Sequence, residues 1–293
     1  MTPARARLDA ELVRRGLARS REQAGELVAA GRVTVAGQRA AKAATQVSRD
    51  APISVTDTGD PGYVSRGGHK LAGALAAFGL AGGPGGNGGA DPPVPGLCGI
   101  VPPGASTAGL TVAGRDCLDA GASTGGFTDV LLRAGAAHVV AADVGYGQLA
   151  WSLRTDPRVT VLDRVNVRTL EGVSPVPGLV VADLSFISLT LVLPALAACA
   201  APDADFVLLV KPQFEVGKGR VGAGGVVRDP ADRADAVRKV AAAAAGLGLG
   251  VLGVTASPLP GPAGNVEYFL WLRSGAPPLD EERLERAIKE GPG

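Results

Sequence analysis

The sequence predicts an α/β protein in which a mostly parallel sheet follows a small α+β domain. Seven short apolar segments recur along the second half of the chain, and stretches with helical spacing, notably 126–133, 189–198 and 232–245, lie between them. Such alternation is typical of a parallel sheet covered on both faces. The last two segments lie close together in the chain, which favours an antiparallel pair at the sheet edge. The expected strands are 117–120, 138–143, 159–163, 179–183, 206–211, 250–256 and 267–273.

The first 60 residues predict a separate small domain. Apolar residues from Leu8 to Leu17 follow helical spacing, so a first helix would bury one stripe and expose its arginines. Ser20 begins a second helix, and Gln23 three residues later completes a capping box. Residues 32–37 then read as a strand that runs into a tight turn. We therefore expect a helix–helix–strand unit at the amino terminus.

Charge is concentrated in this first domain. The whole chain carries a net charge of +1, whereas residues 1–49 hold ten Lys and Arg against four acids, a local charge of +6. A basic block on a balanced protein suggests a polyanionic partner. From charge alone, a solvated helix face remains the alternative. The candidate residues for binding such a partner are Arg5, Arg7, Arg14, Arg15, Arg19, Arg21 and Arg32.

Composition excludes several classes of protein. The three cysteines are odd in number and widely spaced, which fits neither a disulfide framework nor a zinc site. Two histidines cannot build a histidine-rich metal centre, so we expect no metal. No signal peptide opens the chain, and the apolar run 240–254 contains four glycines and is too short to cross a bilayer. The sequence predicts a cytoplasmic protein with no membrane partner.

A second domain is expected over residues 61–293, after a polar linker at 57–62. A helix should begin near Ser65 and end at Phe78, where Gly79 stops it. Residues 81–109 are Gly, Pro, Ala and Ser with almost no charge, which predicts a flexible insertion without a core. We expect this insertion to be dispensable: a deletion variant should keep the activity of the full chain, and loss of folding would refute the expectation.

A glycine loop opens the predicted sheet. Strand 117–120 leads into the Asp119-Ala-Gly-Ala-Ser-Thr-Gly-Gly-Phe127 segment, a helix begins there, and the next strand ends in Asp143. Glycines let the backbone approach a ligand, and the carboxylate after the second strand can bind ribose hydroxyls. The spacing is Asp-x-Gly-x-Ser-x-Gly rather than the dinucleotide pattern Gly-x-Gly-x-x-Gly. The loop therefore favours S-adenosylmethionine (SAM) over a structural turn or a dinucleotide.

Two expected strands end in charge. Asp183 is the last residue of one and Lys211 the last residue of the other, at the carboxyl ends of the strands, where ligands of open α/β sheets bind. A strand has to end in something polar, so each residue alone could be a solvated strand end. The Asp183-Leu-Ser-Phe sequence differs from the Asn/Asp-Pro-Pro-aromatic loop of base amino-methylases, and neither Cys98 nor Cys199 suits a pyrimidine C5-methylase. Methylation of a hydroxyl such as a ribose 2′-OH remains, with a lysine to accept its proton and a carboxylate to orient the lysine.

Longer segments resemble known families. The Arg7–Gly37 region resembles the RNA-binding module of a small-subunit ribosomal protein, pseudouridine synthases and tyrosyl-tRNA synthetases. Segments 119–132, 143–149, 183–189, 210–215 and 264–268 resemble the TlyA family of hemolysin-A-like rRNA methyltransferases with an FtsJ-type catalytic domain. This resemblance implies 2′-O-methylation of cytidine in ribosomal RNA of one or both subunits, with SAM as cofactor. It also implies a catalytic tetrad of Lys70, Asp183, Lys211 and Glu267.

From residue type alone, Lys70 and Glu267 are expected to be solvated charges at the surface. Their catalytic roles are therefore implied only by the resemblance. Within the tetrad, Lys211 is expected nearest the 2′-OH proton and Asp183 beside it. Gly121, Ser123 and Gly125 should lie against the methionine part of SAM, Asp143 at its ribose and Asp163 at its adenine. The candidate cofactor-binding residues are Asp119, Gly121, Ser123, Thr124, Gly125, Gly126, Phe127, Asp143, Asp163 and Asn166.

One departure from the family pattern concerns Val165, which stands where a threonine is expected before Asn166. Two other functions compete with the methyltransferase. A non-catalytic RNA-binding or ribosome-assembly factor could carry a vestigial pocket, although the intact tetrad opposes this. A pore-forming hemolysin is suggested only by the family name, and no apolar span or amphipathic membrane helix in the sequence supports it.

Overall fold

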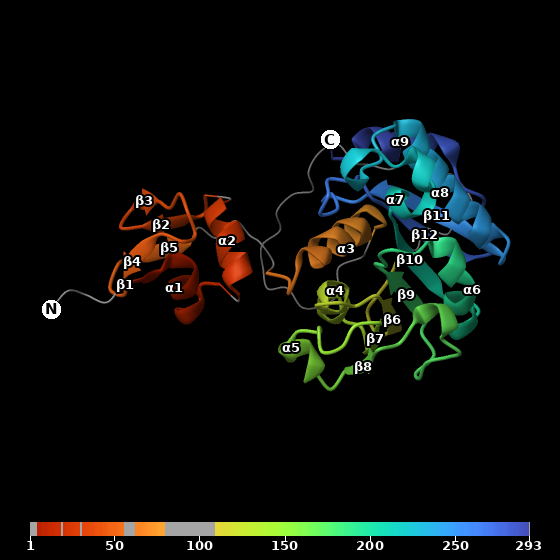
Figure 1. The fold of residues 1–293 in the computed structure, drawn as a ribbon. Coiled ribbons are helices and arrows are strands. Elements are labelled where there is room, and N and C mark those ends of the chain that lie inside the picture. The colour runs from red at the N-terminus through yellow and green to blue at the C-terminus, as the bar shows by residue number, and fades with distance from the viewer. Residues whose placement is uncertain (1–4, 19, 30, 56–61, 80–108, 293) are drawn as a thin grey trace. The chain divides into compact units, whose positions relative to one another are not determined.

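The computed structural model describes residues 5–18, 20–29, 31–55, 62–79 and 109–292 (Figure 1). The chain divides into two compact units, Met1–Gly62 and Tyr63–Gly293. Arg19, Cys98 and all of the predicted insertion except residue 109 lie outside the described residues, as does most of the predicted linker.

The first unit is a small α+β domain built on short strands. Its core holds apolar residues of both helices together with Val33 and Val47. The predicted helices and strand are confirmed, and the Gln23 N–H donates to Ser20 Oγ at 3.1 Å as a helix cap. β2 pairs antiparallel with β3 and β5, and β1 with β4. The elements are β1 Arg5–Arg7, α1 Leu8–Arg14, α2 Arg21–Ala29, β2 Val33–Val35, β3 Gln38–Arg39, β4 Gln46–Ser48 and β5 Ile53–Val55.

The second unit is built on a seven-stranded sheet with the order β11-β12-β10-β9-β6-β7-β8. Five neighbouring strands, from β10 to β8, are parallel, and β12 runs antiparallel to both β10 and β11. The predicted parallel sheet with an antiparallel edge is therefore confirmed. The strands are β6 Asp116–Ala120, β7 His138–Asp143, β8 Val159–Asp163, β9 Leu179–Ala182, β10 Asp205–Val210, β11 Leu249–Ala256 and β12 Tyr268–Ser274.

Helices cover both faces of this sheet (Figure 1). α3 and α4 pack on one face, and α6, α8 and α9 on the other. α4 matches the prediction, whereas α8 begins two residues early because Asp229 caps it and Pro230 suits its first turn. The helices are α3 Arg66–Ala77, α4 Gly126–Arg133, α5 Trp151–Arg154, α6 Leu189–Cys199, α7 Pro212–Glu215, α8 Pro230–Ala245 and α9 Glu281–Glu290, with 3-10 turns η1 Val167–Thr169, η2 Lys218–Arg220 and η3 Ala223–Gly225.

Cys117 and Cys199 are buried free thiols. Within the described ranges, no helix is long and apolar enough to span a bilayer. Among the same residues, no group of three or more His, Cys, Asp or Glu side chains is arranged to hold a metal ion.

Candidate functional site

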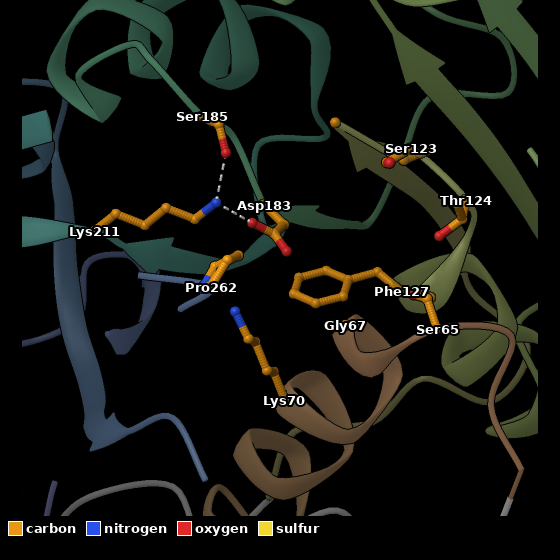
Figure 2. Close-up of a pocket in the computed structure, with 13 residues that line it drawn as sticks. Ser65, Gly67, Lys70, Ser123, Thr124, Phe127, Asp183, Ser185, Lys211 and Pro262 are labelled. Carbon is orange, nitrogen blue, oxygen red and sulfur yellow. Dashed lines mark hydrogen bonds and ion pairs between the residues drawn. The ribbon is translucent and has the colours of Figure 1, made fainter. Parts of the chain in front are cut away.

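The carboxyl ends of β9 and β10 bring an acid and a lysine together. These strands are parallel neighbours, with Leu208 beside Ala182, so the residues that follow them meet at the carboxyl ends of the strands. Lys211 Nζ lies 2.6 Å from Asp183 Oδ1 and donates to Ser185 Oγ at 2.8 Å. Figure 2 shows both contacts as dashed lines from the lysine amine. The lysine is 8% exposed, so these contacts hold its amine in one place.

A second ion pair joins residues distant in sequence. Lys70 lies on α3 and Glu267 immediately precedes β12, and Lys70 Nζ donates to Glu267 Oε2 at 2.6 Å. Both residues are buried. Burial raises the pKa of the Glu267 carboxyl, although the charges of Lys70 and Lys211 act to lower it. Gly261 packs on the other carboxylate oxygen, since a Cβ there would lie 2.5 Å from Oε1. The four predicted tetrad residues thus form two neighbouring pairs that influence each other electrostatically.

A cavity of about 250 Å³ lies between these pairs and the glycine loop. In Figure 2 the amines of Lys70 and Lys211 approach it from different elements, with Asp183 near the centre. Glu267 does not line the cavity and reaches it through Lys70. The lining residues are Ser65, Gly67, Lys70, Gly121, Ala122, Ser123, Thr124, Gly126, Phe127, Asp183, Ser185, Lys211 and Pro262.

The glycine loop packs closely against the end of β9. Gly121 has φ +87°, and a Cβ on it would lie 2.5 Å from the Asp183 carbonyl oxygen. Gly125 has φ +97° and precedes α4, where a Cβ would meet Leu153 at 2.3 Å. Gly121 is therefore required on conformational and steric grounds, and Gly125 on conformational grounds. As a result, the loop backbone stands beside Asp183.

The structure separates the predicted cofactor residues into two groups. Gly121, Ser123, Thr124, Gly126 and Phe127 line the cavity. The remaining residues stand behind it or beside it, where each contacts the protein itself. These are Asp119, Gly125, Asp143, Asp163 and Asn166.

Asp119 is an internal residue rather than a lining one. Its side chain is fully buried, and the Thr128 hydroxyl donates to its Oδ2 at 2.6 Å. Burial raises the pKa of this carboxyl to about 7, while the bond from Thr128 acts in the opposite direction. Asp119 therefore joins β6 to α4 from inside and has no route to a ligand in this structure.

Asp143, at the end of β7, shapes the loop that follows β6. Its Oδ2 accepts the Ser123 N–H at 2.8 Å and its Oδ1 accepts the Gly145 N–H at 2.7 Å. Asp163, at the end of β8, pairs with Arg154 at 2.8 Å, and that bond lowers the pKa of the Asp163 carboxyl. Asn166 accepts the Arg168 N–H and caps a 3-10 turn. Local protein contacts hold all three side chains in place.

In the first unit, buried acids hold exposed arginines. The Asp9 carboxylate accepts from Arg7 at 2.8 Å and from Arg21 at 3.0 Å, and the bond from Arg7 lowers the pKa of this carboxyl. The two arginine side chains remain 47% and 59% exposed. Their guanidinium groups are thus positioned at the surface and still open to a partner.

Arg14 and Arg15 share Glu11 but differ in exposure. Arg14 is 52% exposed, whereas Arg15 is 21% exposed and also donates to the Ala51 carbonyl at 2.8 Å and to the Arg49 carbonyl. Protein acceptors take up donors of Arg15, which gives it structural contacts, and its RNA contact stays a prediction. Of the other predicted residues, Arg5 is exposed, Arg32 is half-buried and Arg19 lies outside the described residues.

Three further residues at the sheet edge were not predicted. Ser185 contacts Lys211, and Phe186 is 92% exposed with φ +64°, a conformation uncommon for a bulky residue. Glu215 is 3% exposed and reaches back to the loop after β9. Two sequence signals could have identified Ser185 and Glu215: a hydroxyl two residues after Asp183 and an acid four residues after Lys211.

Comparisons with known proteins agree with this arrangement. A model described as FtsJ-like methyltransferase matches residues 63–274, and one described as S4 domain matches residues 6–53. The 16S/23S rRNA (cytidine-2'-O)-methyltransferase TlyA of Mycobacterium tuberculosis is 58% identical over 98% of this chain and 99% of its own. Hemolysin A of Brachyspira hyodysenteriae is 33% identical over 90% of this chain and 98% of its own. A solved structure, "Putative hemolysin from Streptococcus thermophilus", matches with TM-score 0.69 and 35% identity over 99% of this chain and 98% of that one.

Proposed function

Because this chain belongs to the TlyA family of FtsJ-like methyltransferases, we propose that it methylates the 2′-hydroxyl of a cytidine ribose in ribosomal RNA, with SAM as methyl donor. The observation that carries the proposal is the contact between Lys211 and Asp183 beside the glycine loop. An amine held at the cavity is the group that such a weakly acidic hydroxyl needs.

The residues that line the cavity fit a SAM molecule. Gly121 and its neighbours present backbone without side-chain bulk, and this loop stands against the strand end that carries Asp183. We assign Gly121–Thr124, Gly126 and Phe127 to its methionine part and Asp143 to its ribose. When bound, SAM supplies a methyl group carried on a positively charged sulfur. The sulfur keeps the electron pair of the broken sulfur–methyl bond.

Lys211 is the group we place at the reacting hydroxyl. The ammonium first gives one proton to solvent, and the neutral Lys211 amine then accepts the 2′-OH proton while the hydroxyl oxygen forms its bond to the methyl carbon. Asp183 and Ser185 hold the Lys211 amine, at 2.6 Å and 2.8 Å. Lys70, fixed by Glu267, brings a second ammonium to the cavity, where it stabilises negative charge on the ribose oxygen. Much of the rate comes from holding oxygen, carbon and sulfur in line.

The first unit supplies affinity for RNA in this proposal. Its match to an S4 domain and the exposed guanidinium groups of Arg7, Arg14 and Arg21 support this role. Contacts from arginine to phosphate release counterions, so affinity for ribosomal RNA should fall steeply with salt.

The test is transfer of a labelled methyl group from SAM to ribosomal subunits lacking the modification, followed by mapping of 2′-O-methyl marks. Lys211→Ala should abolish transfer while SAM and RNA affinities stay within about twofold of wild type, because truncation leaves the glycine loop and the first unit in place. A fully active variant would refute the assignment of Lys211. A wild-type protein that binds RNA but transfers no methyl group would support the non-catalytic alternative.

A further inference from the structure

Glu215 is a buried acid that the proposed chemistry does not use. It is the last residue of α7, the short helix that begins directly after Lys211, and it is 3% exposed. Its Oε1 accepts the Leu189 N–H at 2.7 Å, and its Oε2 accepts the Ser188 hydroxyl at 2.5 Å. The carboxylate therefore links the segment after β10 to the segment after β9.

These two segments carry the central ion pair of the site. Residues 183–188 form the loop between β9 and α6, and residues 211–215 form the corner after β10. At one end of the loop, Asp183 and Ser185 contact the Lys211 amine. At the other end the loop contacts Glu215. Between them the rings of Phe186 and Phe214 lie 5.3 Å apart, so the two segments also contact each other between these two ends.

The contact that Glu215 makes with α6 adds to a cap that this helix already has. Ser188 already caps α6 locally, since its side chain accepts the Thr190 N–H. The carboxylate reaches this helix from 26 residues away in the chain. α8 fixes the corner from behind, because Lys239 Nζ donates to the Glu215 carbonyl at 2.7 Å and lies 3.6 Å from Oε2. The position of the loop relative to Lys211 thus depends on a contact made from the corner itself.

We propose that Glu215 is a positioning residue for methyl transfer: by clamping the loop 183–188 to the corner 211–215, it sets the distance between Asp183 and the Lys211 amine. The inference rests on the proposed function. Errors of about 1 Å in the placement of reacting groups can cost about 100-fold in rate. Loss of the clamp should therefore lower the rate of the chemical step and leave the cofactor loop, which follows β6, unchanged.

The experiment compares single-turnover methyl transfer with SAM binding in three variants of the full chain. Glu215→Ala should lower the transfer rate about 10-fold to 100-fold while the Kd for SAM stays within about twofold. Glu215→Gln keeps an oxygen for the Leu189 N–H and should restore the rate to within about fivefold of wild type. Asp280→Ala is the matched control: Asp280 caps α9 through the N–H groups of Glu282 and Arg283, away from the cavity, and its loss should lower Tm without changing the rate.

A transfer rate within twofold of wild type in Glu215→Ala would overturn the inference. So would an equal loss of rate in Asp280→Ala, since general destabilisation would then explain both. If Glu215→Ala does not fold, Ser188→Ala removes one of the two clamp contacts, and the same comparison applies to it. Failure of the proposed function is distinguishable, because the wild-type protein itself would then transfer no methyl group in this assay.

Discussion

The buried Asp119 makes stability depend on pH in an unusual direction. Burial raises the pKa of its carboxyl from an ordinary 3.8 to about 7. The native state therefore holds this proton to a higher pH than the unfolded chain does. The stabilisation is fully present below about pH 4 and is lost as pH rises to about 7. Ordinary paired carboxylates contribute in the opposite sense.

The magnitude follows from the two pKa values. A change from 3.8 to about 7 is roughly three pH units, and each unit corresponds to about 1.4 kcal/mol, so Asp119 alone removes about 4 kcal/mol of stability between pH 4 and pH 7. Asp119→Asn has nearly the same shape and does not titrate. The free energy of unfolding of the variant minus that of wild type should therefore rise by about 4 kcal/mol across this range and stay constant above it.

Urea unfolding at half-unit pH intervals from 4 to 8 measures this difference. Trp271 is buried in β12 of the same unit and reports through its fluorescence. Asp205→Asn is the contrasting variant. Burial acts to raise the Asp205 pKa, but hydrogen bonds from Arg273, Trp271 and Arg115 outweigh it and lower the value. Asp205→Asn should lower the free energy of unfolding at all these pH values, and its difference from wild type should change little with pH above pH 5. A difference for Asp119→Asn that changes by less than about 1 kcal/mol would refute the reasoning.

Two further predictions concern ion pairs. Lys70→Met leaves the Glu267 carboxylate buried without its partner at 2.6 Å and should lower the free energy of unfolding in urea by about 3 to 5 kcal/mol. The double variant Lys70→Met/Glu267→Gln should lose less of this free energy, and equal losses in the two variants would contradict a coupled pair. Arg14→Ala should reduce the slope of log affinity for ribosomal RNA against log salt by about 0.7 to 0.9, as expected for one phosphate contact. Arg15→Ala, at the C-cap of the same helix, should lower stability and leave that slope unchanged, and a reversed pattern would show that exposure misidentifies the RNA-binding arginine.

The elements predicted best are those with strong local signals. The strands at 138–143 and 159–163 and the helix at 126–133 match the structure, because apolar runs and glycines mark their ends. The strands β1 and β3–β5 escaped prediction because two or three residues are too few to show periodicity. α9 was also missed, although the Asp280 cap and buried Leu284 are signals that its sequence contains.

The candidate site was predictable in part. Asp183 and Lys211 could be placed at a sheet edge from their strands alone, whereas Lys70 and Glu267 depended on family resemblance. No local pattern joins those two, since they lie 197 positions apart. Ser185 and Glu215 were missed because their importance comes from partners on another segment. Asp119 and Arg15 have side chains suited to a ligand, and only the folded structure shows the burial of Asp119 and the protein acceptors of Arg15.

The sequence by itself determined the kinds of element, the glycine loop and the charge of the first unit, because periodicity, conformational preference and composition are local properties. Tertiary structure decided which groups meet. The sheet order places β10 between β9 and β12. Lys211 follows β10, Asp183 follows β9 and Glu267 precedes the antiparallel β12, so all three lie at the same end of the strands. Strand order and burial arise from the packing of the whole chain, and a side chain's partners and pKa depend on both.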